Sequence, residues 1–231
     1  MTTPDRRLTR IARSVTECDR CPELRRYCAD VGREKKRAFA DWTYWARPVP
    51  GFGDPNASIV IVGLAPAAHG ANRTGRMFTG DRSGDFLYAG LHRAGFASQA
   101  EATHRDDGLT LHGIYITAAL RCAPPANKPT ADQLERCRPH LVAELEVIQP
   151  RVLLCLGRIG WDSALSALRQ IGHPMPRPRP RFGHGAFAEV GRVALLGCYH
   201  VSQQNTFTGR LTESMFDDIL DRAGTLANVG R

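Results

Sequence analysis

The chain has 231 residues, enough for one substantial core, and 42% of them are hydrophobic, as is normal for a globular protein. No apolar run approaches the roughly 18 residues of a membrane-spanning helix, and the N-terminal MTTPDRRLTR lacks the apolar stretch of a secretory signal, so we expect a cytoplasmic protein without membrane contact. The formal net charge of +8, carried mainly by arginine, favours a polyanionic partner such as nucleic acid, although solubility and an arginine-rich codon usage would give the same charge.

The first half of the chain predicts helices, an arm and one buried strand. Residues 5–30 are expected to be helical, with an elbow at Cys18–Pro22, and the basic then aromatic residues 31–50 to form an ordered arm packed on that segment. The apolar run 58–66 predicts a buried strand, and a glycine-bearing loop follows over 67–81. Ser83 is expected to cap a helix that runs to about Arg93.

The second half alternates buried strands and helices. We expect strands over 114–120, 151–157, 186–190 and 192–200, and helices over about 130–148, 158–170 and 211–223, the first of them capped by Thr130. The segment 172–185, rich in Pro, Arg and Gly, is expected to be a loop. This alternation predicts a single α/β domain over residues 1–231, with a mostly parallel sheet covered on both faces. Ligands bind such sheets at the carboxyl ends of the strands, which points to the loops 63–81, 121–130 and 200–210.

Seven cysteines in a cytoplasmic chain do not indicate a disulfide framework. Cys155 and Cys198 lie in apolar runs and are expected to be small buried hydrophobic residues. Four others form a C-x2-C pair and a wide pair that together suit zinc or an iron–sulfur cluster: Cys18, Cys21, Cys122 and Cys137. The wide second pair favours the larger cluster. Cys28 is a rival ligand on spacing alone, and a set of free thiols is the alternative to any metal site.

The three strand-end loops read GLAPAAHGANRTGRMFTGD over 63–81, RCAPPANKPT over 121–130 and HVSQQNTFTGR over 200–210. Together with the order of the cysteines, they resemble the uracil-DNA glycosylase superfamily, in particular its iron–sulfur type B branch, also called family 5. The resemblance extends from Cys18 through the final helix. It implies a three-layer α/β/α fold and a structural [4Fe–4S] cluster without a catalytic metal. The implied ligands are Cys18, Cys21, Cys122 and Cys137, and Cys28 lies outside that pattern.

The function that the resemblance implies is a monofunctional DNA glycosylase. Such an enzyme hydrolyses the N-glycosidic bond of uracil in double- and single-stranded DNA and so initiates base excision repair; we expect a monomer, used at the nucleoid of a prokaryotic cytoplasm. This chain has Ala65 where many relatives carry an acidic or polar residue, and Ala118 where they carry a base-reading Asn. Both absences look like features of the type B branch, and they imply relaxed specificity towards hypoxanthine, xanthine and modified uracils.

Three side chains are the expected catalytic groups. Asp81 would hold the attacking water or stabilise the cationic sugar, although an Asp with Ser83 and Gly84 following it is more commonly a helix cap. His200 would donate a hydrogen bond to the oxyanion of the departing base, with a structural histidine as the alternative. The amide of Asn127 would bind the base or the water, unless Asn127 only forms a turn before Lys-Pro.

Other residues of the loops are expected to contact the substrate. Phe78 would stack on the flipped base, with core packing as its alternative role, and the main chain near Leu64, Ala65 and His69 would contact the base or a phosphate. The expected DNA contacts are Asn72 and Arg73 at phosphates, with Gln203, Gln204 and Asn205 entering the groove. Two other functions remain open from the residues alone: a non-catalytic, metal-stapled DNA-binding protein, and a hydrolase of small nucleotides.

Overall fold

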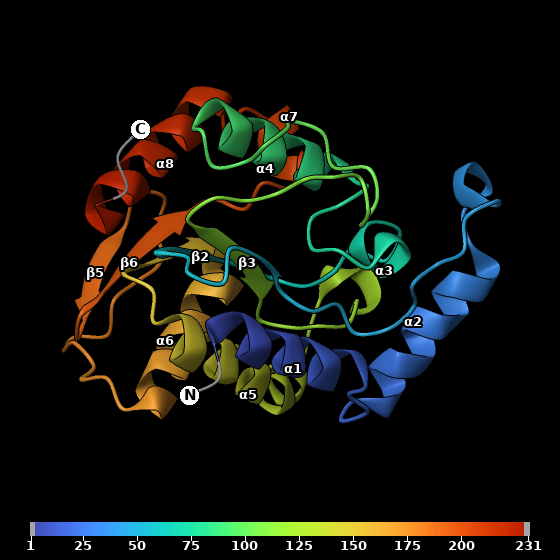
Figure 1. Cartoon of the computed structure of the whole chain (residues 1–231), viewed down its shortest axis with the longest axis horizontal. Helices are drawn as coiled ribbons and strands as arrows, with labels where there is room; N and C mark the ends of the chain where they lie inside the picture. Colours follow the sequence, from blue (N-terminus) through green and yellow to red (C-terminus); the bar gives the residue numbers. More distant parts are fainter. Residues whose placement is uncertain (1–2, 229–231) are drawn as a thin grey trace.

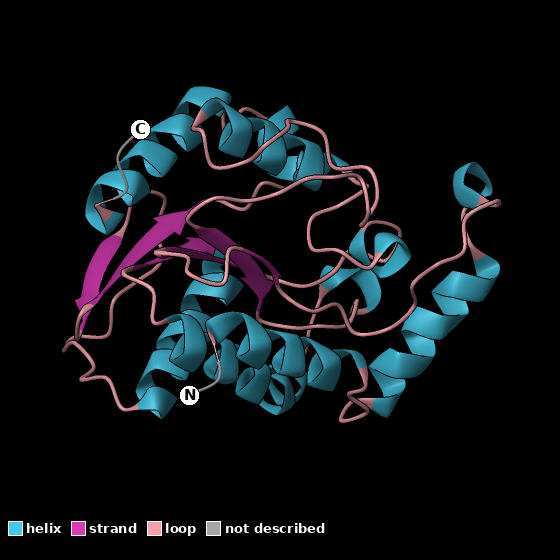
Figure 2. Ribbon diagram, viewed as in Figure 1, coloured by secondary structure: helices cyan, strands magenta, loops and turns pink. Residues whose placement is uncertain are grey.

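The structure is a computed structural model that describes residues 3–228, and it contains one six-stranded sheet between two layers of helices (Figures 1 and 2). The strands lie in the order β1-β3-β2-β4-β6-β5. Their bounds are β1 Phe52–Gly53, β2 Ile59–Gly63, β3 Ile114–Ala118, β4 Val152–Leu156, β5 Phe187–Val190 and β6 Val193–Cys198. The central strands β3, β2, β4 and β6 are parallel, and the edge strands β1 and β5 pair antiparallel to their neighbours. The predicted three-layer α/β/α class with a mostly parallel sheet is confirmed.

The central strands are apolar on both faces, because each face supports a separate core. In β2, Ile59 and Ile61 belong to the core under α4 (Arg82–Arg93) and α8 (Glu213–Ala227), whereas Val60 and Val62 point into the opposite core. Successive side chains of a strand point to opposite faces, so a strand covered on both sides becomes an uninterrupted apolar run.

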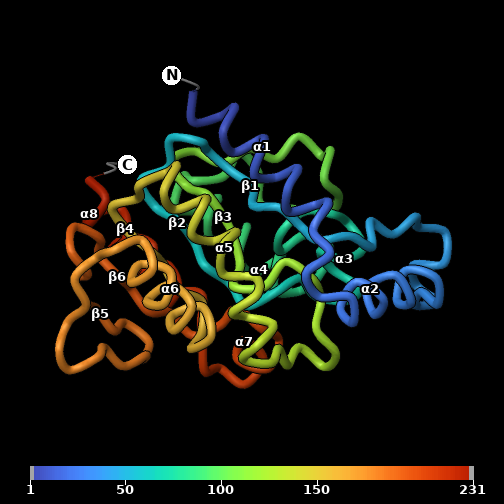
Figure 3. The backbone as a smooth tube through the Cα atoms, turned by 90° about the horizontal axis from the view of Figure 1, so that it is seen from below, coloured from blue at the N-terminus to red at the C-terminus, as the bar shows by residue number. Residues whose placement is uncertain are grey.

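The second helical layer consists of α1 (Pro4–Thr16), α5 (Ala131–Ile148) and α6 (Gly157–Ile171), which lie side by side in Figure 3. Thr130 and Gln133 form a capping box at the start of α5, as the predicted Thr130 cap requires. Both sulfur-bearing strand residues are fully buried, Cys155 in β4 and Cys198 in β6, which confirms their expected packing role.

Several short elements differ from expectation. The long first loop contains the four-residue helix α3 (Ala71–Thr74), and the last loop contains α7 (Gln203–Phe207). Ser83 is not the cap of α4, because the Asp81 side chain accepts the hydrogen bonds that cap this helix. The last helix, α8, begins after Thr212 and extends to Ala227.

The N-terminal region forms two helices separated by the predicted elbow. α1 ends at Thr16, and α2 (Pro22–Glu34) begins directly after Cys21. A 3-10 turn, η1 (Arg37–Phe39), opens the arm, which then runs past α3 to β1 (Figure 1). Among the helices in residues 3–228, none combines the length and apolarity needed to cross a membrane. The outer ends of the predicted domain, residues 1–2 and 229–231, lie outside the described part.

Candidate active site

A cavity of about 1100 Å³ lies at the carboxyl ends of the parallel strands, where sheets of this kind bind ligands. Its walls come from the loop after β2, the loop after β3 and the loop after β6, the same segments that the sequence indicated. Among the expected site residues, the lining includes Leu64, Ala65, His69, Phe78, Asp81, Asn127, His200, Gln203 and Gln204. The fold therefore brings together side chains that lie more than 100 residues apart in the chain.

Asp81 occupies one wall of this cavity. It is the N-cap of α4, and its Oδ1 accepts hydrogen bonds from the main-chain N–H groups of Ser83, at 2.9 Å, and Gly84, at 3.1 Å. The other oxygen, Oδ2, lies against Gly70, where an added Cβ would come within 1.9 Å of it. Burial raises the pKa of Asp81, and the two N–H donors oppose that shift. The cap uses Oδ1 alone, so the cap and the catalytic role, which the sequence posed as alternatives, do not exclude each other.

His200 approaches the cavity from the end of β6. Its main-chain oxygen accepts a hydrogen bond of 2.8 Å from the Asn205 side chain, which holds the turn that follows. Its Cβ would lie 3.3 Å from a Cβ added at Gly157. Burial lowers the pKa of His200 to about 4, so the imidazole is neutral at pH 7. A neutral imidazole still carries one N–H and can donate a hydrogen bond to a developing anion.

Phe78 lines the same cavity in a strained conformation. Its φ of 53° is in the left-handed region, which side chains other than Gly rarely adopt. The ring covers Gly63 so closely that an added Cβ there would lie 2.7 Å from it, and the Phe78 and His200 ring centroids are 6.2 Å apart. An aromatic face held at the cavity wall beside a donor suits the stacking of a planar base.

The N-terminal arm completes the cavity. Tyr44 on the arm hydrogen bonds through its hydroxyl to Nδ1 of His69, at 2.9 Å. Tyr27 on α2, Lys36 just before η1 and Phe39 at the end of η1 also line the cavity. Sequence reasoning assigned none of these aromatic residues to the site, because nothing in their local pattern shows that the arm returns to loop 63–81.

Asn72 and Arg73 do not reach the surface, and the expected phosphate contacts of their side chains need correction. They are only 0% and 4% exposed. Asn72 donates to the main-chain oxygens of Cys28 and Ala68. Arg73 donates to the main-chain oxygens of His69, at 2.9 Å, and Gly80, at 2.7 Å. Both residues therefore hold the loop in shape.

The guanidinium of Arg73 also anchors the arm. It lies 4.0 Å from the ring centroid of Phe39 and 4.1 Å from that of Trp42. Flat stacking of this kind uses the faces of the guanidinium, while its edges donate hydrogen bonds to the loop. One buried side chain thus joins the first strand-end loop to the arm.

The rim of the cavity carries exposed side chains. Gln203 and Gln204 begin α7 and are exposed, as a groove contact requires, whereas Asn205 holds the His200 turn. Asn127 lies at the rim with a φ of 55°, in the turn that was its alternative interpretation. Phe207, at the end of α7, is 75% exposed. The sequence reasoning did not single it out, although a lone aromatic residue in a polar loop was a usable signal.

The four cysteines expected to bind metal line a second, smaller cavity of about 20 Å³: Cys18, Cys21, Cys122 and Cys137. Cys28 does not line this cavity. It lies next to Cys122, and its thiol donates to the main-chain oxygen of Ala123 at 3.7 Å. Within residues 3–228, no three His, Cys, Asp or Glu side chains are already arranged around a metal position.

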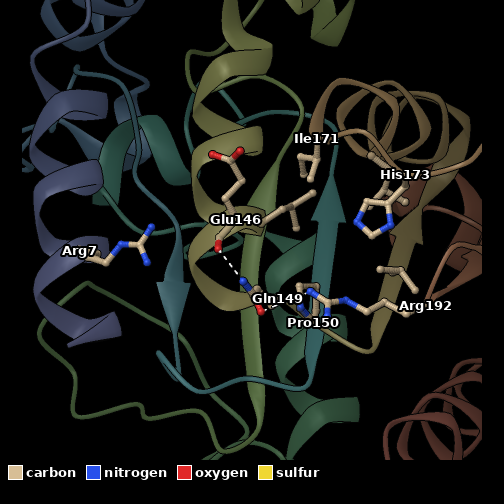
Figure 4. Close-up of a pocket in the computed structure, with 10 residues that line it drawn as sticks. Arg7, Glu146, Gln149, Pro150, Ile171, His173 and Arg192 are labelled. Atoms are coloured by element: carbon tan, nitrogen blue, oxygen red, sulfur yellow. Dashed lines mark hydrogen bonds between the residues drawn. The ribbon is translucent and has the colours of Figure 1, made fainter. Parts of the chain in front are cut away.

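Another cavity, of about 440 Å³, lies at the amino ends of β4 and β6, at the opposite end of these strands from the first cavity (Figure 4). Its polar groups contact each other: Gln149 donates to the main-chain oxygen of Glu146 at 3.5 Å and accepts from Arg192 at 3.3 Å. It contains none of the expected site residues. The cavity at the carboxyl ends is therefore the candidate active site.

Known proteins resemble this chain over most of its length. Residues 50–224 match the sequence model of the uracil DNA glycosylase superfamily. The Type-5 uracil-DNA glycosylase of Mycobacterium tuberculosis is 51% identical over 218 residues, which cover 93% of this chain and 80% of the relative. The Type-5 uracil-DNA glycosylase of Thermus thermophilus is 50% identical over 221 residues, which cover 94% of this chain and 96% of the relative. The Type-5 uracil-DNA glycosylase of Pyrobaculum aerophilum is 41% identical over 209 residues, which cover 90% of this chain and 88% of the relative.

Proposed function

Because the chain belongs to the uracil DNA glycosylase superfamily, we propose that it hydrolyses the N-glycosidic bond of uracil in DNA and so initiates base excision repair. The observation that carries this proposal is the single cavity lined by Asp81, Phe78 and His200 at the carboxyl ends of the strands. The enzyme acts as a monomer at the nucleoid, on double- and single-stranded DNA.

In the proposed reaction, Asp81 acts on the sugar and His200 acts on the base, and both residues line the cavity. The target base leaves the stack, enters the cavity and lies against Phe78; unstacking costs a few kcal/mol. As the glycosidic bond breaks, positive charge develops on the sugar and negative charge on the base. Asp81 stabilises the sugar and orients the attacking water through the oxygen that does not cap α4. His200 donates its N–H to the departing base without carrying a charge of its own.

We propose a broad range of bases. Ala65 lines the cavity with a methyl group, and Ala118, at the end of β3, is 1% exposed and has no side-chain amide to read a base. A cavity that recognises its ligand mainly by stacking and main-chain contacts discriminates weakly, since strong rejection requires polar groups left unpaired by the wrong ligand. Hypoxanthine, xanthine and modified uracils are therefore substrates beside uracil, with Asn127 as the amide available to the base or the water.

We further propose that the smaller cavity holds a [4Fe–4S] cluster bound by Cys18, Cys21, Cys122 and Cys137. Four thiols lining one cavity are a suitable donor set for such a cluster. Four arginines line the same cavity and supply positive charge for thiolates: Arg20, Arg25, Arg121 and Arg136. The cluster would join the elbow before α2 to α5 and to the loop that carries Asn127, which is a structural role.

The decisive experiment is a glycosylase assay under single-turnover conditions. Duplexes containing U·G, U·A, inosine and xanthine are incubated with the purified protein, and abasic sites are scored by alkaline cleavage. Release of uracil but not of the purines would remove the broad specificity and leave the main proposal intact. Salt-sensitive binding without release of any base would instead indicate a DNA-binding protein, and hydrolysis of free nucleotides alone a nucleotide hydrolase. Iron and sulfide analysis of the same preparation tests the cluster proposal. Protein that contains zinc in place of iron and sulfide would exclude it.

A further inference from the structure

Arg121 is a fully buried arginine beside the cysteine cavity. Its side chain is 1% exposed, and it directly precedes Cys122 in the chain. Its main-chain N–H donates a hydrogen bond to the sulfur of Cys137, and its main-chain oxygen accepts one of 2.8 Å from Val49. The residue therefore contacts one cysteine through its backbone and adjoins another in sequence.

The counter-charge of Arg121 is Glu144 on α5, which is 0% exposed. Its Oε2 accepts hydrogen bonds from Nη2 of Arg121 and, at 2.6 Å, from the Thr117 hydroxyl, and its Oε1 accepts one of 3.3 Å from the Tyr115 hydroxyl. Glu144 thus accepts three hydrogen bonds, two from β3 and one from Arg121. This arrangement fixes the guanidinium, but it uses one of the three guanidinium nitrogens.

The other two nitrogens of Arg121, Nε and Nη1, have no hydrogen-bond partner among the described residues. A guanidinium has five N–H donors and cannot lose its charge, so buried donors without an acceptor are costly and uncommon. The unpaired donors therefore belong to a charged group that lines the cysteine cavity.

The other arginines of this cavity are already paired. Arg136 contacts Asp132 and donates to the main-chain oxygen of Arg20 at 3.0 Å, and Arg25 donates to the main-chain oxygen of Ala46 at 3.4 Å. Arg20 donates to the main-chain oxygen of Arg136 at 3.3 Å. Arg121 differs from them in combining full burial with two guanidinium nitrogens that lack partners.

We propose that Arg121 donates N–H···S hydrogen bonds from Nε and Nη1 to the iron–sulfur cluster and thereby makes the cluster easier to reduce. The inference rests on the cluster proposed above. Hydrogen bonds to the sulfurs and the local charge are the means by which a protein sets the potential of such a cluster. Reduction adds an electron to the cluster, and a fixed cation with two donors favours that extra negative charge.

The first test looks for the contact in the unmodified protein. Protein is labelled with arginine that carries 15N only in the guanidinium group and is reduced with dithionite, and electron–nuclear double resonance measures couplings between the cluster spin and these nitrogens. We expect a coupling that persists in Arg136→Gln, a matched control in which an already paired arginine of the same cavity is removed. Absence of any arginine coupling in the reduced protein would overturn the proposal without the need for an Arg121 variant.

The second test measures the reduction potential. Arg121→Lys keeps the charge but has a different donor geometry, and Arg121→Met with Glu144→Gln removes the buried ion pair as a unit. In the double variant we expect the equilibrium constant for one-electron reduction to fall at least tenfold, which is about 59 mV. The reduction potential of Arg121→Lys should lie between those of the double variant and the unmodified protein. Arg136→Gln should change the potential much less.

These outcomes separate the inference from the proposals on which it rests. Purified protein without iron would remove the cluster proposal, whatever Arg121 does. Protein that contains the cluster, but has the same potential in the double variant as in the unmodified protein, would show that Arg121 only pairs with Glu144. Uracil release by the unmodified protein reports on the glycosylase separately, because neither test of Arg121 uses activity as its measurement.

Discussion

Asp81 divides its two carboxylate oxygens between the fold and the proposed chemistry. Asparagine at this position keeps the side-chain oxygen that caps α4, and Asn is as good an N-cap as Asp, but it removes the negative charge. We expect Asp81→Asn to slow uracil release by roughly 10²–10⁴-fold with an almost unchanged melting temperature. Asp81→Ala is the contrasting variant, because it should also lose about 1 kcal/mol of stability with the cap. An Asn variant that is as fast as the unmodified protein would leave Asp81 as a helix cap only.

The same carboxylate sets the expected pH dependence. Burial raises the pKa of Asp81, so this group takes up its proton at a higher pH than an exposed aspartate does. Uracil release should therefore fall as the pH decreases through that raised pKa, whereas His200, with a pKa of about 4, stays neutral over most of the range. Single-turnover rates between pH 4 and 8 test this. The acid limb should be missing in Asp81→Asn, and an acid limb that persists there would assign it to another group.

His200 is expected to act on the departing base. His200→Ala should slow uracil release by roughly 10²–10³-fold, the usual cost of removing one donor from an oxyanion site. The loss should be smaller for 5-fluorouracil, whose anion is more stable and depends less on the donor. Parallel assays of duplexes containing either base measure the two losses. Equal losses for both bases would indicate that His200 shapes the cavity and does not stabilise the anion.

At the scale of elements, the N-terminal arm is attached to the site through Arg73. Lysine at this position keeps a charge but lacks the planar guanidinium, which lies over the Phe39 and Trp42 rings while donating to two loop carbonyls. We expect Arg73→Lys to increase amide hydrogen exchange over the arm, residues 37–46, and to slow uracil release. The matched control is Arg37→Lys, since Arg37 is exposed on the same arm. Unchanged exchange in Arg73→Lys would show that the arm is held by other contacts.

The elements also show which parts of the fold can be predicted from a sequence. The buried strands were predictable because double-sided burial makes them apolar throughout, and the capped helix α5 because Thr130 and Gln133 interact locally. The short helices α3 and α7 were not, since four or five residues carry too little pattern.

The same limit applies to the site. Its loops followed from the strand ends, but the contact of Tyr44 with His69 and the burial of Arg73 depend on tertiary packing that no local pattern encodes.

At the scale of the whole molecule, the net charge of +8 favours DNA binding at the active site only if the positive side chains lie near that site. Lys36, Arg82 and Lys128 all line the rim of the candidate active site and are exposed, so they are available to phosphates. Each phosphate contact releases counterions, and its loss should reduce the slope of log K against log salt by about 0.9. We therefore expect Lys36→Gln, Arg82→Gln and Lys128→Gln each to weaken binding of undamaged duplex and to flatten this slope.

Arg192 provides the matched control, because it is an exposed arginine at the cavity by the amino ends of β4 and β6 (Figure 4). Arg192→Gln removes the same charge from the molecule but not from the rim. If net charge alone attracts DNA, all four variants should lose affinity alike; if the rim contacts the backbone, Arg192→Gln should keep the slope of the unmodified protein. Titrations between 50 and 200 mM salt, a range over which phosphate contacts change affinity by orders of magnitude, distinguish the two. We expect Arg192→Gln to keep the slope of the unmodified protein. Salt screens charges beyond about 10 Å, so a charge at the amino ends of the strands has little influence on DNA bound at the candidate active site.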